Sequence, residues 1–257
     1  MTNSRYIEHT NLSLAWGLAV RAMTARGGPR ELAPLVVSIT GFERNAPIED
    51  AAVRKALDDV LAASGKQSSH TVANTIFPES LWNPKQPRKL LFDRYKMSLP
   101  RLRKASKKNR HGLYFQRLIE GGPPGHENQL EFIIDQYVAR KAVRRSALQV
   151  AIFDAKLDLT NAALRGFPCL QHVTFAPTRA GLQVNAFYAT QYAFERAYGN
   201  YLGLCGLGRL VAHEFRMPLV RVTCFTGIMM RDHDVKTVAL KPIATAVDTA
   251  LQKETDQ

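Results

Sequence analysis

One segment, residues 200–215, constrains the fold more than any other, because it has helical periodicity and is apolar on nearly every side. Such a helix needs protein all around it, since a helix at the surface carries a polar stripe. Three apolar runs of strand length precede it, at residues 146–153, 170–175 and 182–188, and we predict that they are strands of one sheet. A buried helix backed by a sheet indicates an α+β domain.

Other segments add further helices and one more strand. Residues 11–23, 48–63 and 128–140 have apolar residues at helical spacing, whereas residues 35–39 form a short β-branched run that is typical of a strand. The chain has 257 residues, of which 46% are hydrophobic, and no Gly/Ser-rich or Pro-rich linker divides it. We therefore predict a single domain over residues 1–257.

The charge of the chain points to an anionic partner, either a small phosphorylated ligand or a nucleic acid. The formal net charge is +13 at pH 7, and such an excess attracts anions. A dense basic run at residues 101–110 is either a solvated surface or a contact surface for phosphate or nucleic acid. It lacks the interleaved aromatic residues on which single-stranded bases stack.

No feature of the sequence predicts a membrane partner. No stretch approaches the roughly 20 apolar residues that a membrane-spanning helix needs, and residues 1–20 lack the pattern of a secretory signal. We expect a cytoplasmic protein.

The three cysteines are Cys169, Cys205 and Cys224. They are spread over the C-terminal third of the chain with no two cysteines close together in the sequence, which argues against a disulfide framework and against a zinc site. We expect Cys205 and Cys224 in the core. On residue type and setting alone, Cys169 is either an inert core residue or a nucleophile.

Three motifs follow one another in an informative order. Arg144 and Arg145 precede one predicted strand, Pro168 and Cys169 precede the next, and Asn200 opens the buried helix. This succession resembles the thymidylate synthase family, in which an Arg pair, a Pro-Cys nucleophile and an Asn that reads the pyrimidine edge come in the same order.

Two weaker echoes extend the resemblance to residues 110–230. The Tyr-Phe-Gln-Arg of residues 114–117 resembles the family's Tyr-Gly-x-Gln-Trp-Arg, and the Thr-Gly of residues 226–227 resembles the Thr-Gly of a late strand. The resemblance implies a thymidylate synthase-like fold, with a mixed sheet packed against a long buried helix and a homodimer that forms sheet to sheet.

The resemblance also implies a reaction and its partners. A member of this family adds a one-carbon unit, methyl or hydroxymethyl, to carbon 5 of a pyrimidine nucleoside monophosphate, with methylenetetrahydrofolate as the donor. The Cys169 thiolate would add to carbon 6 and convert carbon 5 into a nucleophile. Neighbouring Arg side chains stabilise a thiolate, which is the reactive form of Cys.

The substrate-binding residues that the resemblance implies are Asn200, Arg144, Arg145 and Arg30. The Asn200 carboxamide offers a donor and an acceptor, which suits uracil better than cytosine, although an Asn at a helix start is also a common cap. In the family the Arg pair reaches the nucleotide phosphate of the partner subunit, and a loop Arg corresponding to Arg30 clamps the same phosphate. Each of these Arg residues could instead be a solvated surface charge.

The sequence departs from the family after the nucleophile. Where the family has Gln-Arg-Ser-x-Asp, residues 188–192 read Tyr-Ala-Thr-Gln-Tyr, so that only the hydroxyl of Thr190 is retained. Arg231 and His233 stand where the family has a His and a Tyr that bind the ribose. The ribose and phosphate contacts therefore differ from those of the family.

The residues for proton transfer and for the folate are the least defined. Glu79 is the best candidate for the family's early Glu, and Trp82 for a residue of the folate pocket, although the first is equally a loop carboxylate and the second a core anchor. The family's C-terminal Ala-Val tail closes over the folate, whereas residues 246–257 have the pattern of a frayed helix.

Two other function classes are compatible with the sequence. One is a noncatalytic homologue that binds or senses a nucleotide, and the other is a nucleic-acid-binding protein that uses residues 101–110. The base, the sugar, the donor and the product, methyl or hydroxymethyl, stay open on the sequence alone.

Overall fold

The computed structural model describes most of the chain. Of the predicted site residues, His233 lies outside the described part, as do residues 106–108 and 110 of the basic run. The described residues are 5–105, 109, 112–140, 143–161, 168–232 and 240–256.

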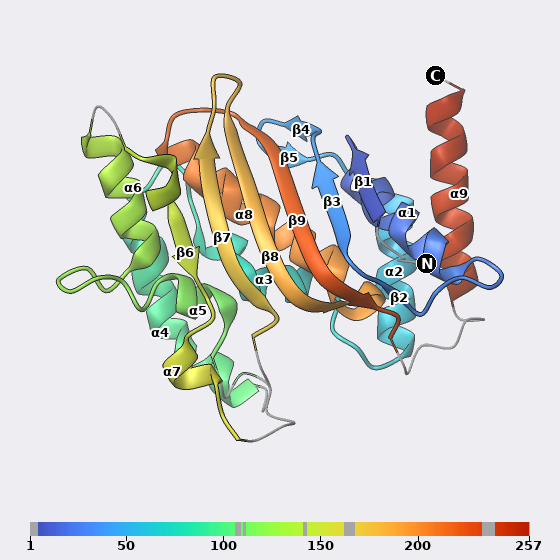
Figure 1. Ribbon diagram of the computed structural model, residues 1–257, viewed down its shortest axis with the longest axis horizontal. Helices are drawn as coiled ribbons and strands as arrows, with labels where there is room; N and C mark the ends of the chain where they lie inside the picture. Colours follow the sequence, from blue (N-terminus) through green and yellow to red (C-terminus); the bar gives the residue numbers. More distant parts are fainter. Residues whose placement is uncertain are drawn as a thin grey trace.

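A mixed, seven-stranded sheet forms the middle of the molecule, with the strand order β1-β3-β9-β8-β7-β6 and with β2 paired to β9 (Figure 1). The pairs β1–β3 and β8–β9 are parallel, and the other pairs are antiparallel. A separate hairpin joins β4 (Phe42–Glu43) to β5 (Ala46–Pro47). The strands of the sheet are β1 (Arg5–His9), β2 (Glu31–Leu32), β3 (Leu35–Ile39), β6 (Gln149–Ala151), β7 (Leu170–Pro177), β8 (Leu182–Tyr192) and β9 (Leu219–Met230).

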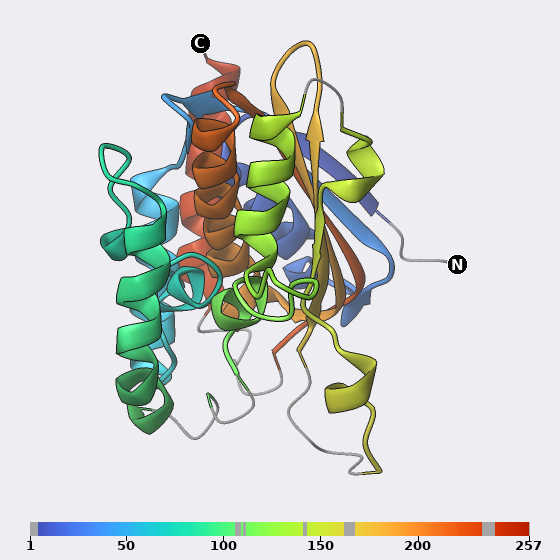
Figure 2. The ribbon, with the colours of Figure 1, turned by 90° about the vertical axis from the view of Figure 1, so that its left-hand side faces the viewer.

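The longer helices cover one side of this sheet (Figure 2). Polar side chains cap several of them: the Asn11 side chain accepts from the backbone N–H groups of Ser13 and Leu14, and Asp50 accepts from that of Val53. The helices are α1 (Leu12–Thr24), α2 (Ala51–Ala63), α3 (Ser69–Ile76), α4 (Lys89–Ala105), α5 (Tyr114–Leu118), α6 (Gln129–Ala139), α7 (Ala155–Asp158), α8 (Tyr198–Glu214) and α9 (Lys241–Thr255).

The helix α8 lies between the sheet and α3, as the all-round apolar pattern of residues 200–215 predicts. Its glycines permit the close approach on the α3 side: a Cβ on Gly203 would lie 2.7 Å from the carbonyl oxygen of Ala73. A Cβ on Gly208 would lie 3.0 Å from side-chain atoms of Leu219 and Val184, so the opposite side of α8 packs on the sheet.

Two predicted elements differ from the structure. The strand predicted over residues 146–153 is reduced to β6, because a 3-10 turn, η3 (Arg145–Ala147), precedes it. Both Ile152 and Phe153 donate their backbone N–H groups to the carbonyl of Gln171, which ends the regular ladder after β6. The end of the chain, for which we expected a frayed helix, forms α9 and buries Val247 against α1.

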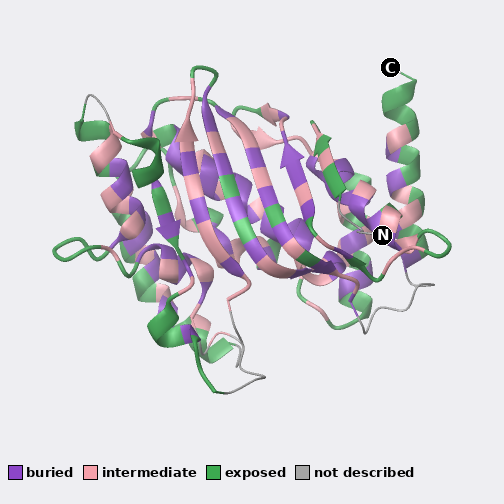
Figure 3. Cartoon of the chain, in the orientation of Figure 1, coloured by how far each residue is buried: buried purple, intermediate pink, exposed green. Residues whose placement is uncertain are grey.

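The other side of the sheet bears none of the long helices, and exposed residues alternate with buried ones along its strands (Figure 3). Side chains opposite one another in neighbouring strands share a face. One such row crosses the sheet on this uncovered face, and Phe187 and Phe225 stack within it with ring centroids 5.4 Å apart. In strand order, the row consists of Tyr6, Val36, Phe225, Phe187 and His172.

No helix in the described part of the chain is both long enough and apolar enough to cross a membrane.

Candidate functional site

Cys169 lies immediately before β7, beside the C-terminal part of β8. Its carbonyl accepts a hydrogen bond of 2.9 Å from the backbone N–H of Ala189, and its Sγ lies 3.5 Å from the Oγ1 of Thr190. The side chain is partly exposed, and no disulfide joins it to another cysteine. The fold thus brings together two of the predicted site residues, Cys169 and Thr190.

Two tyrosine phenols lie close to the thiol of Cys169. The pKa of Tyr114 is raised to about 12, first by burial and then by a charge on Cys169, and hydrogen bonds with the backbone of Leu170 and Cys169 partly offset the rise. Burial also raises the pKa of Tyr188, whose hydroxyl has no hydrogen-bond partner among the described residues. Both phenols therefore stay neutral near pH 7.

Asn200 faces the sheet from the first turn of α8. It is only 3% exposed, and its Oδ1 has no hydrogen-bond partner within the described chain. Asn200, Leu204 and Gly208 follow one another at intervals of four, so they share the side of α8 that packs on the sheet. The alternative interpretation of Asn200 as a helix cap is wrong, because the helix cap is Ala197 and Asn200 lies inside the helix.

The carboxylate of Asp232 caps the start of this helical segment. A π-helical turn, η4 (Ala193–Ala197), leads from β8 into α8, and Asp232 accepts hydrogen bonds of 2.9 Å from the backbone N–H groups of Phe194 and Glu195. Burial raises the pKa of Asp232, and these hydrogen bonds partly offset the rise. No sequence pattern indicates this contact, because Asp232 lies far along the chain from η4.

Arg30 and Arg231 lie next to each other beyond the end of β9. The backbone N–H of Arg231 donates to the carbonyl of Arg30 over 2.9 Å, which continues the pairing of β2 with β9. Thr190 pairs with Ile228 of β9. Arg231 comes three residues after Ile228, which places it about 10 Å beyond Thr190 along the strand direction. These two predicted substrate-binding residues therefore flank the end of the sheet where Cys169 lies.

Arg144 and Arg145 lie at the opposite end of β7. The turn that contains them is fixed by a hydrogen bond of 2.8 Å from the N–H of Phe175 to the carbonyl of Leu148. Cys169 is six residues from Phe175, a separation of about 20 Å along a strand. Within one chain, the structure does not bring this exposed Arg pair to Cys169.

Glu79 and Trp82 also lie away from Cys169, on the side of α8 that faces α3. Glu79 accepts a hydrogen bond from Arg209, and the Arg209 guanidinium lies 5.1 Å from the centroid of the Trp82 ring. Arg209 and Cys205 project from α8 on the side opposite Asn200. The helix α8 thus separates Glu79 and Trp82 from the thiol of Cys169.

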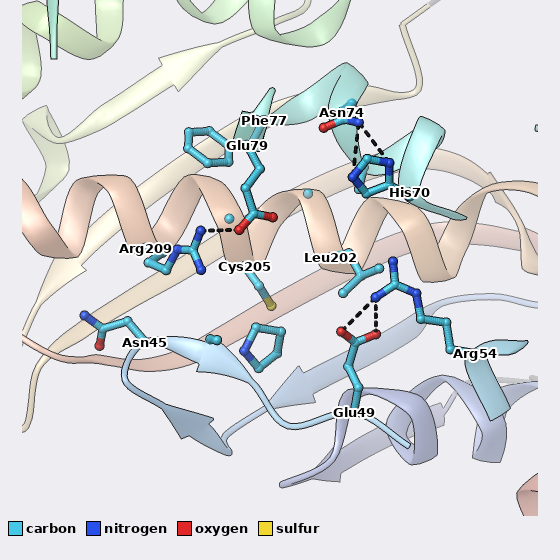
Figure 4. Close-up of a pocket in the computed structure, with 15 residues that line it drawn as sticks. Asn45, Glu49, Arg54, His70, Asn74, Phe77, Glu79, Leu202, Cys205 and Arg209 are labelled. Atoms are coloured by element: carbon cyan, nitrogen blue, oxygen red, sulfur yellow. Dashed lines mark hydrogen bonds and ion pairs between the residues drawn. The ribbon is translucent and has the colours of Figure 1, made fainter. Parts of the chain in front are cut away.

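A cavity of about 140 Å³ lies on this second side of α8 (Figure 4). Its charged groups pair with one another: Glu79 with Arg209, and Glu49 with Arg54 over 3.2 Å. Tyr198 donates a further hydrogen bond of 2.7 Å to Glu49, which ties this pair into the core. The cavity is lined by Asn45, Ala46, Pro47, Glu49, Arg54, His70, Ala73, Asn74, Phe77, Glu79, Leu202, Gly203, Cys205, Gly206 and Arg209.

Cys205 and Cys224 are buried, which confirms that they belong to the core. Burial raises the pKa of Cys224 to about 12 and raises that of Cys205 still further. Both thiols are therefore uncharged near pH 7. Among the described residues, no group of three or more His, Cys, Asp or Glu side chains is placed to hold a metal ion.

The chain resembles a solved structure, thermostable thymidylate synthase A from Bacillus subtilis. The TM-score is 0.53 at 10% sequence identity, and the match covers 93% of this chain and 84% of the other. No protein-family model and no curated protein sequence matches this chain. The chain therefore has a thymidylate synthase-like fold.

Proposed function

We propose that this protein is a thymidylate synthase-like transferase that adds a one-carbon unit, methyl or hydroxymethyl, to carbon 5 of a pyrimidine nucleoside monophosphate. The observation that carries the proposal is the partly exposed thiol of Cys169, which lies among hydroxyl groups at one end of the sheet. The buried carboxamide of Asn200, whose Oδ1 has no hydrogen-bond partner among the described residues, faces the same sheet and supplies a group that can recognise a base.

The chemistry begins at Cys169. Its thiolate adds to carbon 6 of the pyrimidine, and the electron pair of the 5,6 double bond moves onto the oxygen of carbon 4. Asn200 donates from its Nδ2 to this oxygen and accepts the N3–H proton of uracil at Oδ1. Carbon 5 is then nucleophilic. It forms a bond to the electrophilic one-carbon unit, or to a solvent proton in the absence of a donor. Loss of the original proton of carbon 5 and departure of the thiolate from carbon 6 then restore the double bond.

The identity of the one-carbon donor is carried only by the family resemblance, which implies methylenetetrahydrofolate. The residues present do not fit the predicted folate contacts. Trp82 packs against Phe77 and Arg209 on the far side of α8, and the C-terminal segment packs as α9 on α1 and α2.

We propose a homodimer formed by the uncovered face of the sheet, as the family resemblance implies. The row that contains Phe187 and Phe225 gives this face an exposed aromatic centre. A twofold axis that reverses the strand direction would place Arg144 and Arg145 of one subunit over the Cys169 end of the other. The separation of the Arg pair from Cys169 within one chain is therefore compatible with such a dimer, in which each Arg pair serves the partner's site.

Release of tritium from carbon 5 of a labelled uridine or deoxyuridine monophosphate tests the proposed reaction. The exchange requires the Cys169 adduct but no one-carbon donor. We expect release by the native protein and none by Cys169→Ser, whereas the matched control Cys205→Ala, which removes a buried thiol across α8, keeps it. Nucleotide binding without release in the native protein would overturn the proposal in favour of a noncatalytic homologue.

The noncatalytic alternative is favoured by one specific observation. Ala189 and Tyr192 occupy positions where the family has an Arg and an Asp that hold the nucleotide, so part of the family's machinery is absent. A nucleic-acid-binding function would rely on Arg101, Arg103 and Lys104, which are exposed at the end of α4. Steeply salt-dependent binding of oligonucleotides, without nucleotide exchange chemistry, would identify that function.

A further inference from the structure

The cavity on the α3 side of α8 has an ion pair toward each of its ends (Figure 4). Glu49 and Arg54 form one pair, and Tyr198, at the start of α8, donates to the same Glu49. Glu79 and Arg209 form the other pair. Tyr198 and Arg209 are eleven residues apart on α8, which is about 16 Å along the helix axis. The cavity therefore extends along α8 from one pair toward the other.

The wall between the two ion pairs is apolar. Leu202, Gly206 and Arg209 follow one another at intervals of four and three residues, so they share one face of α8. Leu202 and Gly206 line the cavity together with Gly203 from the same helix and Ala73 from α3. None of these four side chains competes for a hydrogen bond, and the wall that they form suits a short hydrocarbon chain.

Both guanidiniums keep donors for a ligand. The two hydrogen bonds that join Arg54 to Glu49 come from its Nη1, and its Nη2 has no hydrogen-bond partner in the described part of the chain. Arg209 donates to Glu79 from its Nη2, and its buried Nε has no partner among the described residues. A guanidinium presents five N–H donors in a fixed fork, which matches the geometry of a carboxylate.

The two carboxylates of the cavity offer less to a ligand than the guanidiniums do. Both oxygens of Glu49 accept from Arg54, and one of them also accepts from Tyr198. The side chain of Glu79 is 55% exposed, so water competes for its oxygens. The free donors of the cavity therefore favour an anionic ligand over a cationic one.

We propose that this cavity is a binding site for a small dicarboxylate, with one carboxylate at Arg54, the other at Arg209 and a short hydrocarbon chain along Leu202. The cavity measures about 140 Å³, close to the roughly 150 Å³ of an engineered apolar cavity that binds benzene. A molecule of that size with a charge at each end fits both the volume and the walls. The site lies across α8 from Cys169 and does not depend on the proposed function.

Succinate, a four-carbon dicarboxylate, is the probe that tests this site. Calorimetric titration of the native protein should give saturable binding, with an affinity at least about tenfold higher than that for butyrate, which has the same chain length and a single carboxylate. Putrescine has an ammonium group at each end of the same chain and should bind no better than butyrate. The absence of succinate binding at millimolar concentrations, equal affinities for succinate and butyrate, or tighter binding of putrescine would overturn the proposal.

Arg209→Gln tests the contribution of one guanidinium. The variant leaves Glu79 in contact with water, so we expect it to fold and to bind succinate at least about tenfold more weakly than the native protein. Arg209→Lys, which keeps the charge but not the fork, should have an intermediate affinity. If Arg209→Gln and the native protein bind succinate equally, the cavity does not hold the dicarboxylate.

The matched control is Arg21→Gln. Arg21 pairs with Asp248 of α9 over 3.3 Å and does not line the cavity, so this variant changes the net charge equally at a distant ion pair. It should bind succinate like the native protein. An equal fall in both Gln variants would mean that the net charge, and not the cavity, attracts the anion, and would contradict the proposal.

The outcomes for this site and for the proposed function are distinguishable. If succinate binds as expected but the native protein releases no tritium from carbon 5 of a nucleotide, the proposed function fails and the dicarboxylate site stands. If tritium is released but succinate does not bind, the dicarboxylate site fails and the proposed function stands.

Discussion

The Asp232 carboxylate accepts a hydrogen bond from the backbone N–H of Phe194, and through this contact the segment that follows β9 caps the helical turn that follows β8. An anion is stabilised at the start of a helix, so Asp232 occupies a place that a phosphate would otherwise find favourable. Asn200 therefore does not act as a helix cap. Its buried Oδ1 is left without a partner in the described chain.

We expect Cys169 to be the cysteine that reacts first with iodoacetamide. Cys205 and Cys224 are buried, and burial raises the pKa of both thiols, so each is inaccessible and protonated near neutral pH. Peptide mass mapping after brief alkylation at pH 7.5 should find the label on Cys169. Labelling of all three cysteines at similar rates in the folded protein would contradict the site assignment.

We expect Phe187→Glu to prevent dimer formation. The Phe187 side chain is 41% exposed in the aromatic row of the uncovered sheet face, and a carboxylate there would be buried without a partner in the dimer. The dissociation constant should rise at least about 30-fold, the effect of losing a central contact residue. Light scattering over a dilution series measures this change.

The control for the dimer prediction is Met97→Glu. Met97 is 82% exposed on α4, on the helical side of the molecule, so this variant introduces the same charge away from the proposed interface. It should dimerise like the native protein. A native protein that is monomeric at micromolar concentration with nucleotide present would remove the basis for assigning Arg144 and Arg145 to the partner's phosphate.

The stability of the protein should depend on His172 below pH 6.5. Burial lowers the pKa of His172 from its ordinary value of 6.5, so the folded state favours the neutral imidazole. This contribution to the free energy of unfolding is present above pH 6.5 and is lost as the pH falls through the lowered pKa. Urea unfolding at pH 8 and pH 5.5 should show a smaller pH effect in His172→Gln than in the native protein. Equal pH effects in the two proteins would show that His172 does not contribute to the pH dependence of stability.

The sequence predicts those parts of the fold that local periodicity determines. The buried helix α8 and the strands β3, β7 and β8 have strong patterns and occur where we expect them. The strands β1 and β2 were not predicted, because short segments become strands only through partners that are distant in sequence. The strand over residues 146–153 was overextended, since its apolar pattern cannot reveal where pairing ends.

Site residues could be predicted where a sequence motif identifies both the functional residue and the strand or helix that carries it. Cys169 and Thr190 meet because β7 and β8 pair directly. The sequence also predicts Glu79 and Trp82 as residues of the Cys169 site. No sequence pattern, however, can tell on which side of α8 a loop residue will lie. Asp232 was not identified, because its role arises from a contact between two segments that are far apart in the sequence.

Asn200 should select uracil over cytosine. Its carboxamide can donate to the oxygen of carbon 4 and accept from N3–H, whereas cytosine presents an amino group and an acceptor nitrogen at these places. A mismatched, buried polar group costs about 1 to 3 kcal/mol, or roughly 5- to 150-fold in affinity. Uridine monophosphates should therefore bind more tightly than cytidine monophosphates by a factor in this range.

Asn200→Asp should shift the preference toward cytosine. A carboxylate accepts from the amino group of cytosine, and its protonated form can donate to the ring nitrogen. The control Asn74→Asp makes the same change at the cavity across α8, where Asn74 contacts His70, and should keep the native preference. Calorimetric titration of the three proteins with both monophosphates measures the two affinities directly. If the native protein and Asn200→Asp bind both bases equally, the carboxamide does not read the base, and the assignment of uracil loses its support.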